Sequence, residues 1–171
     1  MNFTVPSKSS SNFYLTIISQ PEKEKVIEYN KKEKIIFLNP EYIITPFQIK
    51  LCVNKSYHDI LIKKSKTKNE KNNIIFTSTN EEKLDKSLKI HNITNNKKNN
   101  YYVLFIDMDK NEIENIIKDL KGEEINEINY SKYVNEELII NYFKIKKEEI
   151  QSRENGLINA IYNRLSTKNL K

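Results

Sequence analysis

The chain has 171 residues, a formal net charge of +6 and a single cysteine. This length suits one domain with a proper core and is short for two. No apolar run reaches the eighteen residues or so that a membrane helix needs, and the first residues lack the basic-then-apolar order of a signal peptide. A lone cysteine excludes an internal disulfide and a cysteine-rich metal site. We therefore expect no membrane partner and a reducing setting, the cytoplasm or nucleus.

The positive charge is a weak indication of nucleic-acid binding. Only Arg153 and Arg164 are arginine among the 29 basic residues, and asparagine and isoleucine are also abundant. That bias is typical of an A/T-rich genome, whereas a surface selected for bidentate phosphate contacts would hold more arginine. Any argument for nucleic acid therefore depends on local clusters of lysine.

The first third of the chain predicts a short leader followed by alternating elements. Residues 1–12 are expected to be a disordered leader, and residues 13–171 a single domain. The aromatic and β-branched run Phe13–Ile18 predicts a buried strand. Pro21 opens a short charged helix that continues to about residue 32. Ile35–Leu38 is either a strand or the approach to the next turn.

The residues from Thr45 onward predict the start of a helix. Thr45 is a good N-cap, Pro46 tolerates the first helical position, and Gln48 can reach back to the Thr45 N–H to close a capping box. The apolar stripe that follows has helical spacing and predicts a helix to about Ile62. Its members are Ile49, Cys52, Val53, Ser56, Tyr57 and Ile60.

The middle of the chain predicts a connector, a strand and a helix. Residues 63–71 form a basic connector, and Asn73–Thr77 is interpreted as a strand. Thr79 is expected to cap the next helix with Glu82 at its third position. Asn92 is then expected to adopt the left-handed conformation that ends such a helix.

The second half predicts the central strand and three further helices. Tyr101–Ile106 is a continuous apolar run and is expected to be a strand covered on both faces. The remaining predicted segments are a helix over 112–120, a strand or extended segment over 125–130, a helix over 135–143 and a last helix carrying Ile150, Leu157, Ile158, Ile161 and Leu165. Gly156 is expected to weaken that helix by about 1 kcal/mol relative to alanine. The pattern predicts a single α/β domain with a small mixed β-sheet packed with amphipathic helices.

No set of residues predicts catalysis, and we expect no catalytic residue, cofactor or metal site. The two glycines cannot build a glycine-rich phosphate loop. Cys52 and His58 lie six apart on one helix and point to different sides, so they cannot form a nucleophile–base pair. Asp107 and Asp109 could contribute to a metal site, but a turn and a helix N-terminus explain them more simply.

Three sequence motifs resemble those of one family. They are the segment LNPEYIITPFQI from Leu38, with Asn54, Lys55 and His58 after it; the basic segment from Lys64 with Ile74–Phe76; and Ala160–Lys168. They resemble the TPRKB-like, Cgi-type subunits of the KEOPS (EKC) complex, which bind its PRPK-type kinase. The resemblance covers roughly residues 35–170 in the same order. His91 stands where the family usually has an apolar aromatic, and is expected to be a packing or surface residue.

The resemblance implies a non-catalytic subunit that binds the kinase and supports N6-threonylcarbamoyladenosine modification of tRNA. Some such subunits are implicated in holding the tRNA 3′ end. The residues expected at the kinase interface are Leu84, Leu88, Ile90 and Ile93, each of which could instead be core. Those expected to contact tRNA are Lys63, Lys64, Lys66, Lys68 and Lys168, although Lys63–Lys71 could equally be a solvated loop.

Two other classes of function stay open. A free-standing RNA-binding protein could use the same lysines, but the chain lacks the glycine-rich motifs of common RNA-binding modules. A small enzyme of unknown class would need a site that the residues do not supply.

Overall fold

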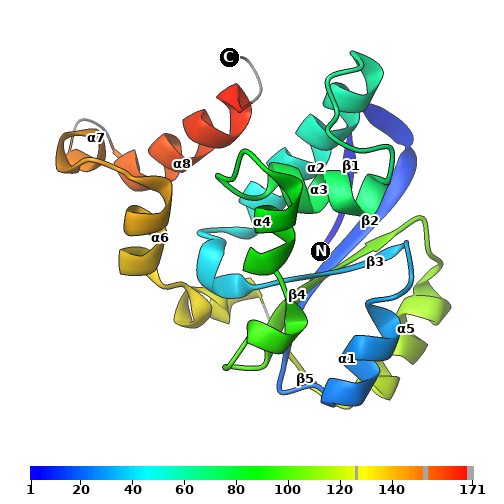
Figure 1. The fold of residues 1–171 in the computed structure, drawn as a ribbon. Coiled ribbons are helices and arrows are strands. Elements are labelled where there is room, and N and C mark those ends of the chain that lie inside the picture. The colour runs from blue at the N-terminus through cyan, green and yellow to red at the C-terminus, as the bar shows by residue number, and fades with distance from the viewer. Residues whose placement is uncertain (126, 152–153, 169–171) are drawn as a thin grey trace.

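The computed structural model, which describes residues 1–125, 127–151 and 154–168, is a single α/β domain (Figure 1). Its sheet has the order β1-β2-β4-β3, with β5 also paired to β2. The strands are β1 (Asn2–Val5), β2 (Lys8–Ser19), β3 (Ile35–Leu38), β4 (Asn100–Ile106) and β5 (Glu123–Ile125). Every pairing between them is antiparallel, so the α/β class is confirmed but the sheet is not mixed.

Strand β4 is the centre of the sheet, as its sequence predicts. It lies between β2 and β3, with Leu104 opposite both Leu15 and Ile36, and all of its residues are buried. Alternate side chains enter different clusters: Leu104 packs on one side of the sheet, and Phe105 on the other. A strand covered on both faces has no need of polar alternation, which explains its continuous apolar run.

The expectation of a disordered leader over residues 1–12 is wrong. These residues form β1 and the start of β2, and Phe3 and Val5 are buried. The Phe3 ring stacks on Phe13, with 5.3 Å between ring centroids. The two buried residues alternate in an otherwise polar segment, so their strand becomes favourable only where β2 offers an edge to pair with.

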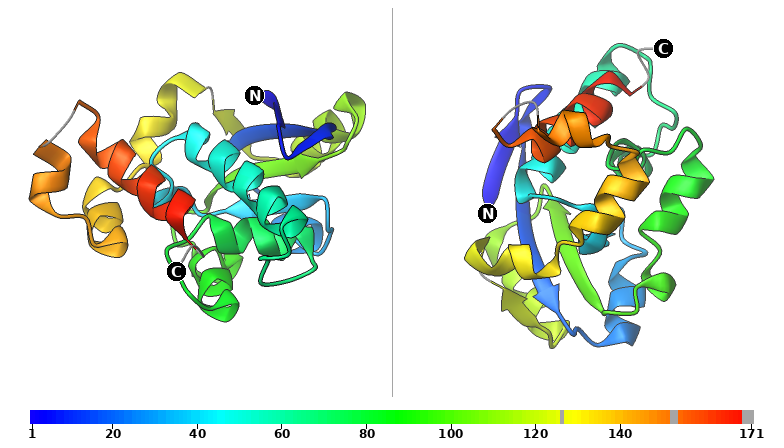
Figure 2. Two further views of the ribbon diagram at one scale, coloured as in Figure 1. Left: turned by 90° about the horizontal axis from the view of Figure 1, so that it is seen from above. Right: turned by 90° about the vertical axis from the view of Figure 1, so that its left-hand side faces the viewer.

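Helices cover both faces of the sheet and add a further layer (Figures 1 and 2). The α-helices are α1 (Lys23–Tyr29), α2 (Pro46–Leu61), α3 (Glu70–Thr77), α4 (Leu84–Ile90), α5 (Lys110–Asp119), α6 (Glu136–Phe143), α7 (Lys147–Gln151) and α8 (Gly156–Thr167). Three 3-10 turns lie at Pro40–Tyr42, Ile93–Asn95 and Glu127–Tyr133. Helices α1 and α5 pack on one face of the sheet, and α2 and α3 on the other. Helices α6 and α8 pack on the outer side of α2. No described helix is both long and apolar enough to cross a membrane.

Helix α2 begins where the sequence predicts, but its cap differs in detail. Thr45 Oγ1 accepts from the Gln48 N–H at 3.3 Å. Gln48 does not reach back to Thr45. Its side chain accepts from the Ile44 N–H at 2.8 Å and donates to the Tyr42 carbonyl at 3.2 Å. Because Gln48 is fully buried, it satisfies the backbone of the preceding turn rather than closing the capping box.

The strand expected over Asn73–Thr77 is wrong, because this segment belongs to helix α3. Asn69 caps the helix by accepting from the Asn72 N–H at 2.8 Å. Ile74 and Ile75 pack toward the sheet, and Phe76 is also fully buried. A short helix that is buried on several sides presents the same continuous apolar run as a buried strand.

The start and end of α4 also differ from expectation. The helix begins only at Leu84, and the Thr79 hydroxyl donates to the Phe76 carbonyl at 3.1 Å and lies 2.7 Å from the Ser87 hydroxyl. Asn92 has a φ of −66°, so it is not left-handed; it caps the turn that follows. Burial of the Thr79 hydroxyl between two segments replaces the expected capping role.

The helices over 112–120 and 135–143 are confirmed as α5 and α6. The last predicted stripe is divided, because Ile150 belongs to α7 and the other four residues to α8. At Gly156 an added Cβ would lie 2.2 Å from the Ile150 carbonyl oxygen. This glycine therefore permits a close approach between two helices, which opposes the gain expected from alanine. Of the described residues within 125–130, Ile125 alone belongs to a strand, and those from Glu127 onward form a 3-10 turn; the side chain of Ile128 lies outside the described residues.

Candidate functional site

A basic pocket of about 610 Å³ lies where the end of α8 meets the end of α6 and the segment before α4. Five cationic residues line it, namely Lys66, Lys83, Lys144, Arg164 and Lys168, with Glu81 and Glu82 as the acidic ones. Two of the lysines expected to contact tRNA, Lys66 and Lys168, are thus brought to one place from distant parts of the chain. Lys83 and Arg164 also line this pocket, although the sequence pattern did not single them out.

Lys168 forms part of this pocket but turns its ammonium group inward. Its Nζ donates to the carbonyls of Phe76 and of Thr79, the latter at 2.8 Å, and lies 3.6 Å from the centroid of the Phe76 ring. Burial lowers the pKa of Lys168 to about 7, because the charged form loses its hydration. Lys168 therefore anchors the end of α8 on the end of α3. To reach a phosphate, its ammonium group would have to leave these carbonyls.

Arg164 shapes the opposite wall. It makes two hydrogen bonds of 2.8 Å to the two carboxylate oxygens of Glu149, and it donates to the Lys144 carbonyl at 3.1 Å. This guanidinium holds the pKa of Glu149 well below its usual range, at about 2. Bidentate pairing fixes the guanidinium plane, so Arg164 joins α7 to α8 next to the pocket.

The lysine-rich connector is exposed beside the pocket. Lys63, Lys64, Lys66 and Lys68 are all exposed between α2 and α3. Lys71 differs: it is buried, and its Nζ donates to the carbonyls of Asn30 and Lys32. Burial lowers its pKa to about 8. The connector thus presents four surface cations, and the fifth lysine of the cluster is structural.

Helix α4 presents part of the expected kinase interface. Leu88 is 37% exposed, and Leu84 and Ile90 are half-buried. Ile93 is only 5% exposed and packs in the cluster between the sheet and helices α1 and α5. The structure therefore leaves three of these four side chains accessible and assigns the fourth to the core. In Figure 1, α4 lies at the front of the molecule.

Three exposed apolar side chains on α2 and just after it were not predicted as binding residues. Phe47 is 54% exposed, Leu61 66% and Ile62 44%. The centroid of the Phe47 ring lies 5.5 Å from that of the Tyr162 ring on α8. The signal for Leu61 and Ile62 was present, since both follow the end of the apolar stripe immediately before the lysines.

The Leu38-Asn39-Pro40 segment and His91 meet in a buried network that positions α4. The Asn39 N–H donates to His91 Nδ1 at 3.0 Å, and His91 Nε2 lies 2.9 Å from the Ser78 hydroxyl. Burial lowers the pKa of His91 to about 3, so the ring is neutral at pH 7. This agrees with a packing role and ties the end of α4 to the turn before α2.

The residues considered for catalysis have structural roles. Cys52 is buried, which raises its pKa to about 12, while His58 is exposed on the same helix. Asp109 caps α5 by accepting from the Glu112 N–H at 2.8 Å. Asp107 accepts from the Ser11 hydroxyl and from the Asn12 N–H, each at 2.9 Å. In the described ranges, no group of three or more histidines, cysteines or carboxylates comes together to hold a metal.

These surfaces define a small α/β binding protein, with a basic pocket and a partly exposed apolar helix. The family described as kinase binding protein CGI-121 has a model that matches residues 16–169, and this chain belongs to that family. The family is one of kinase-binding proteins, which agrees with the resemblance of the three sequence motifs to Cgi-type subunits.

Proposed function

We propose that this chain is a non-catalytic subunit of a KEOPS-like complex, in which it binds the PRPK-type kinase subunit and supports threonylcarbamoyladenosine modification of tRNA. The observation that carries the proposal is the membership in a kinase-binding family together with the apolar side chains that α4 leaves exposed. Exposed apolar anchors on a helix suit a protein partner, because burying them releases water from apolar surface.

Leu88 is the central residue of this docking surface. Replacing it with glutamate places a charge where the kinase would exclude water, and we expect the replacement to abolish capture of the kinase subunit. Leu61→Glu is the matched variant, since Leu61 is a more exposed leucine and is the last residue of α2. Co-purification with the PRPK-type kinase measures binding, and circular dichroism with melting checks the fold of each variant.

The results separate the two surfaces. Loss of capture with Leu88→Glu alone, in a folded variant, supports docking through α4. Loss of capture with Leu61→Glu alone moves the interface to the end of α2. If neither folded variant loses the kinase, the proposed docking is wrong at both sites.

We also propose that the connector and the basic pocket contact tRNA. Lys63, Lys64, Lys66 and Lys68 are exposed, and Lys66 leads directly into the pocket. Their contribution would be mainly electrostatic, because each phosphate that a lysine neutralises releases condensed counterions. Lys168 would join them only after leaving its carbonyl partners.

A salt titration tests this surface. We expect Lys66→Glu with Lys68→Glu to weaken tRNA binding. The slope of log K against log salt should fall by about 0.7 for each phosphate of single-stranded RNA that the protein no longer neutralises. The matched control is Lys110→Glu with Lys118→Glu, which makes the same charge change on α5, across the sheet from α2 and α3. Equal binding by the connector variant and the parent at two salt concentrations would show that the connector is a solvated loop.

A further inference from the structure

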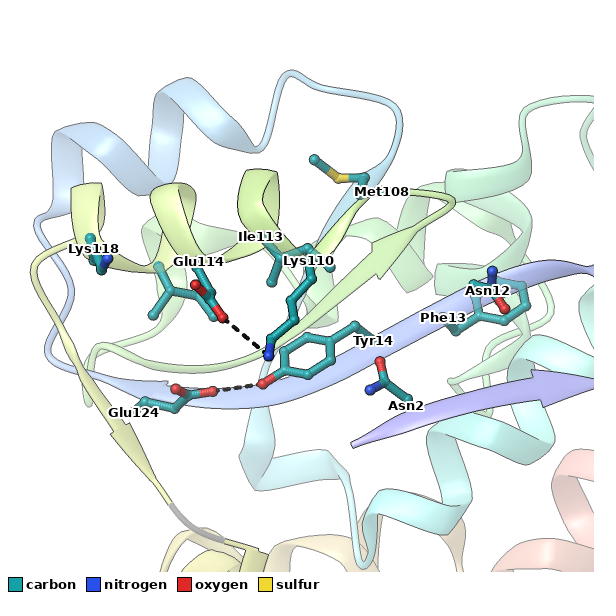
Figure 3. A pocket seen from close by; sticks show the side chains of 11 residues that line it. Asn2, Asn12, Phe13, Tyr14, Met108, Lys110, Ile113, Glu114, Lys118 and Glu124 are labelled. Atoms are coloured by element: carbon teal, nitrogen blue, oxygen red, sulfur yellow. Dashed lines mark hydrogen bonds and ion pairs between the residues drawn. The ribbon is translucent and has the colours of Figure 1, made fainter.

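A second cavity, of about 390 Å³, lies beside α5 on the face of the sheet that this helix covers (Figure 3). Its floor is apolar and consists of the Tyr14 ring, Met108, Ile113 and Ile117. This volume is within the range of about 300–1,000 Å³ that small-molecule sites occupy. The cavity is separate from the basic pocket, with which it shares no lining residue.

Charged groups of both signs meet at the mouth of this cavity. From α5, Lys110 Nζ lies 3.7 Å from a carboxylate oxygen of Glu114. From β5, Glu124 accepts from the Tyr14 hydroxyl at 3.1 Å and from the Thr16 hydroxyl at 2.6 Å. Figure 3 shows the Lys110 ammonium group paired with Glu114, and the Tyr14 hydroxyl paired with Glu124.

We propose that this cavity binds a free α-amino acid with an apolar side chain. The ligand's carboxylate would pair with Lys110, and its ammonium group would lie between Glu114 and Glu124. Its side chain would cover Met108 and the isoleucines of the floor. Both charges of the zwitterion and its apolar part thus find complementary groups from separate elements.

Other classes of small molecule fit the lining less well. A phosphate or another anion would meet Lys110 and Lys118, but it would also face the carboxylates of Glu114 and Glu124. A wholly apolar molecule would remove water from Lys110 and these carboxylates without offering them a partner. The proposal depends on this cavity alone and is independent of kinase or tRNA binding.

Titration of the purified protein with L-phenylalanine and L-leucine tests the proposal. We expect saturable shifts of the Ile113, Ile117 and Met108 methyl signals in NMR spectra. N-acetyl-L-phenylalanine lacks the ammonium charge, and L-phenylalaninamide lacks the carboxylate. Each should bind about tenfold more weakly or worse, because it cannot form one of the charge-assisted hydrogen bonds. Equal binding by either analogue would contradict recognition of the zwitterion, and so would the absence of shifts at these methyls.

Matched variants locate the charged groups that hold the ligand. Glu124→Gln keeps the shape of its side chain, and Lys110→Gln removes the positive charge. Each should weaken L-phenylalanine binding about tenfold. Glu123→Gln is the control, since Glu123 is the next residue in β5 and alternation points it to the other face of the sheet. Melting curves check that each variant is folded. The proposal fails if Glu123→Gln weakens binding as much as Glu124→Gln, or if neither cavity variant weakens it.

Discussion

Polar side chains with buried partners connect segments that lie far apart in this chain. Lys168 reaches the carbonyls at the end of α3, and His91 joins α4 to the turn before α2. Each of these groups replaces its hydration with a partner in the protein, which is the condition for burying a polar group. The roles of Lys168 and His91 are therefore set by residues distant in sequence.

The buried ammonium group of Lys168 should make stability depend on pH. Its pKa is lowered from 10.5 to about 7 in the folded protein, so between these values the unfolded state binds more protons. Stability from this group therefore rises with pH across that window, by at most about 1.4 kcal/mol per pH unit. Lys168→Met removes this dependence. Denaturant unfolding from about pH 7 to about pH 9.5 should show that the free energy of unfolding of the parent rises relative to that of the variant.

The exposed Lys89 supplies the control for that measurement. Lys89→Met, measured across the same pH range, shows what replacing an exposed lysine does by itself. Parallel curves for the parent and Lys168→Met would contradict a buried, titrating Lys168.

Cys52 should behave as a packing residue. Burial raises the pKa of its thiol to about 12, so the native protein should resist thiol-specific reagents until it unfolds. Cys52→Ala should lower the free energy of unfolding by roughly 1 kcal/mol and leave kinase capture unchanged. Fast modification of the native thiol, or failure of the folded variant to capture the kinase, would assign Cys52 a functional role.

At the scale of elements, long amphipathic segments are predictable and short apolar runs are not. Helix α2 has a cap and several turns of stripe, and it begins at the predicted residue. Helix α3 has an apolar run of only a few residues, and the packing around it decides between helix and strand. Asn69, the N-cap of this helix, is the local signal in the sequence that favours a helix here.

The junction of α7 and α8 reverses a prediction based on helix propensity. Propensity favours alanine over glycine by about 1 kcal/mol, yet a Cβ at Gly156 would meet the Ile150 carbonyl oxygen at 2.2 Å. We expect Gly156→Ala to lower the free energy of unfolding by about 1–3 kcal/mol, because the two helices must move apart. Thermal and denaturant melting measure the change. A variant more stable than the parent would show that propensity outweighs the close approach.

At the scale of the whole molecule, the sheet separates two apolar clusters and α2 separates a third from the sheet. Helix α2 therefore contributes to two layers, with Ile49 and Val53 toward the sheet and Cys52 toward α6 and α8. The surfaces proposed for partners lie outside these layers. Changes at the exposed Leu88 and Lys66 should consequently affect binding more than folding.

The N-terminal hairpin should belong to the cooperative fold. Phe3 is buried against Phe13 in the cluster beneath α2, so Phe3→Ala should lower the free energy of unfolding by about 3 kcal/mol. The matched control is Thr4→Ala, since Thr4 is exposed on the other face of β1. Denaturant unfolding compares the two variants. A disordered leader would tolerate both changes equally.

By itself, the sequence determined the α/β class, the central strand, the cap of α2 and the family. These depend on the local sequence pattern and on motifs of several residues. Only the tertiary structure decided that residues 1–12 pair with the sheet, that 73–77 are helical, and that Ile93 is core. The same holds for the inward turn of Lys168 and for the meeting of Lys66 with Lys83 and Arg164. These features depend on which distant segments supply a strand edge, a carbonyl or an apolar surface. The local sequence pattern does not specify those partners.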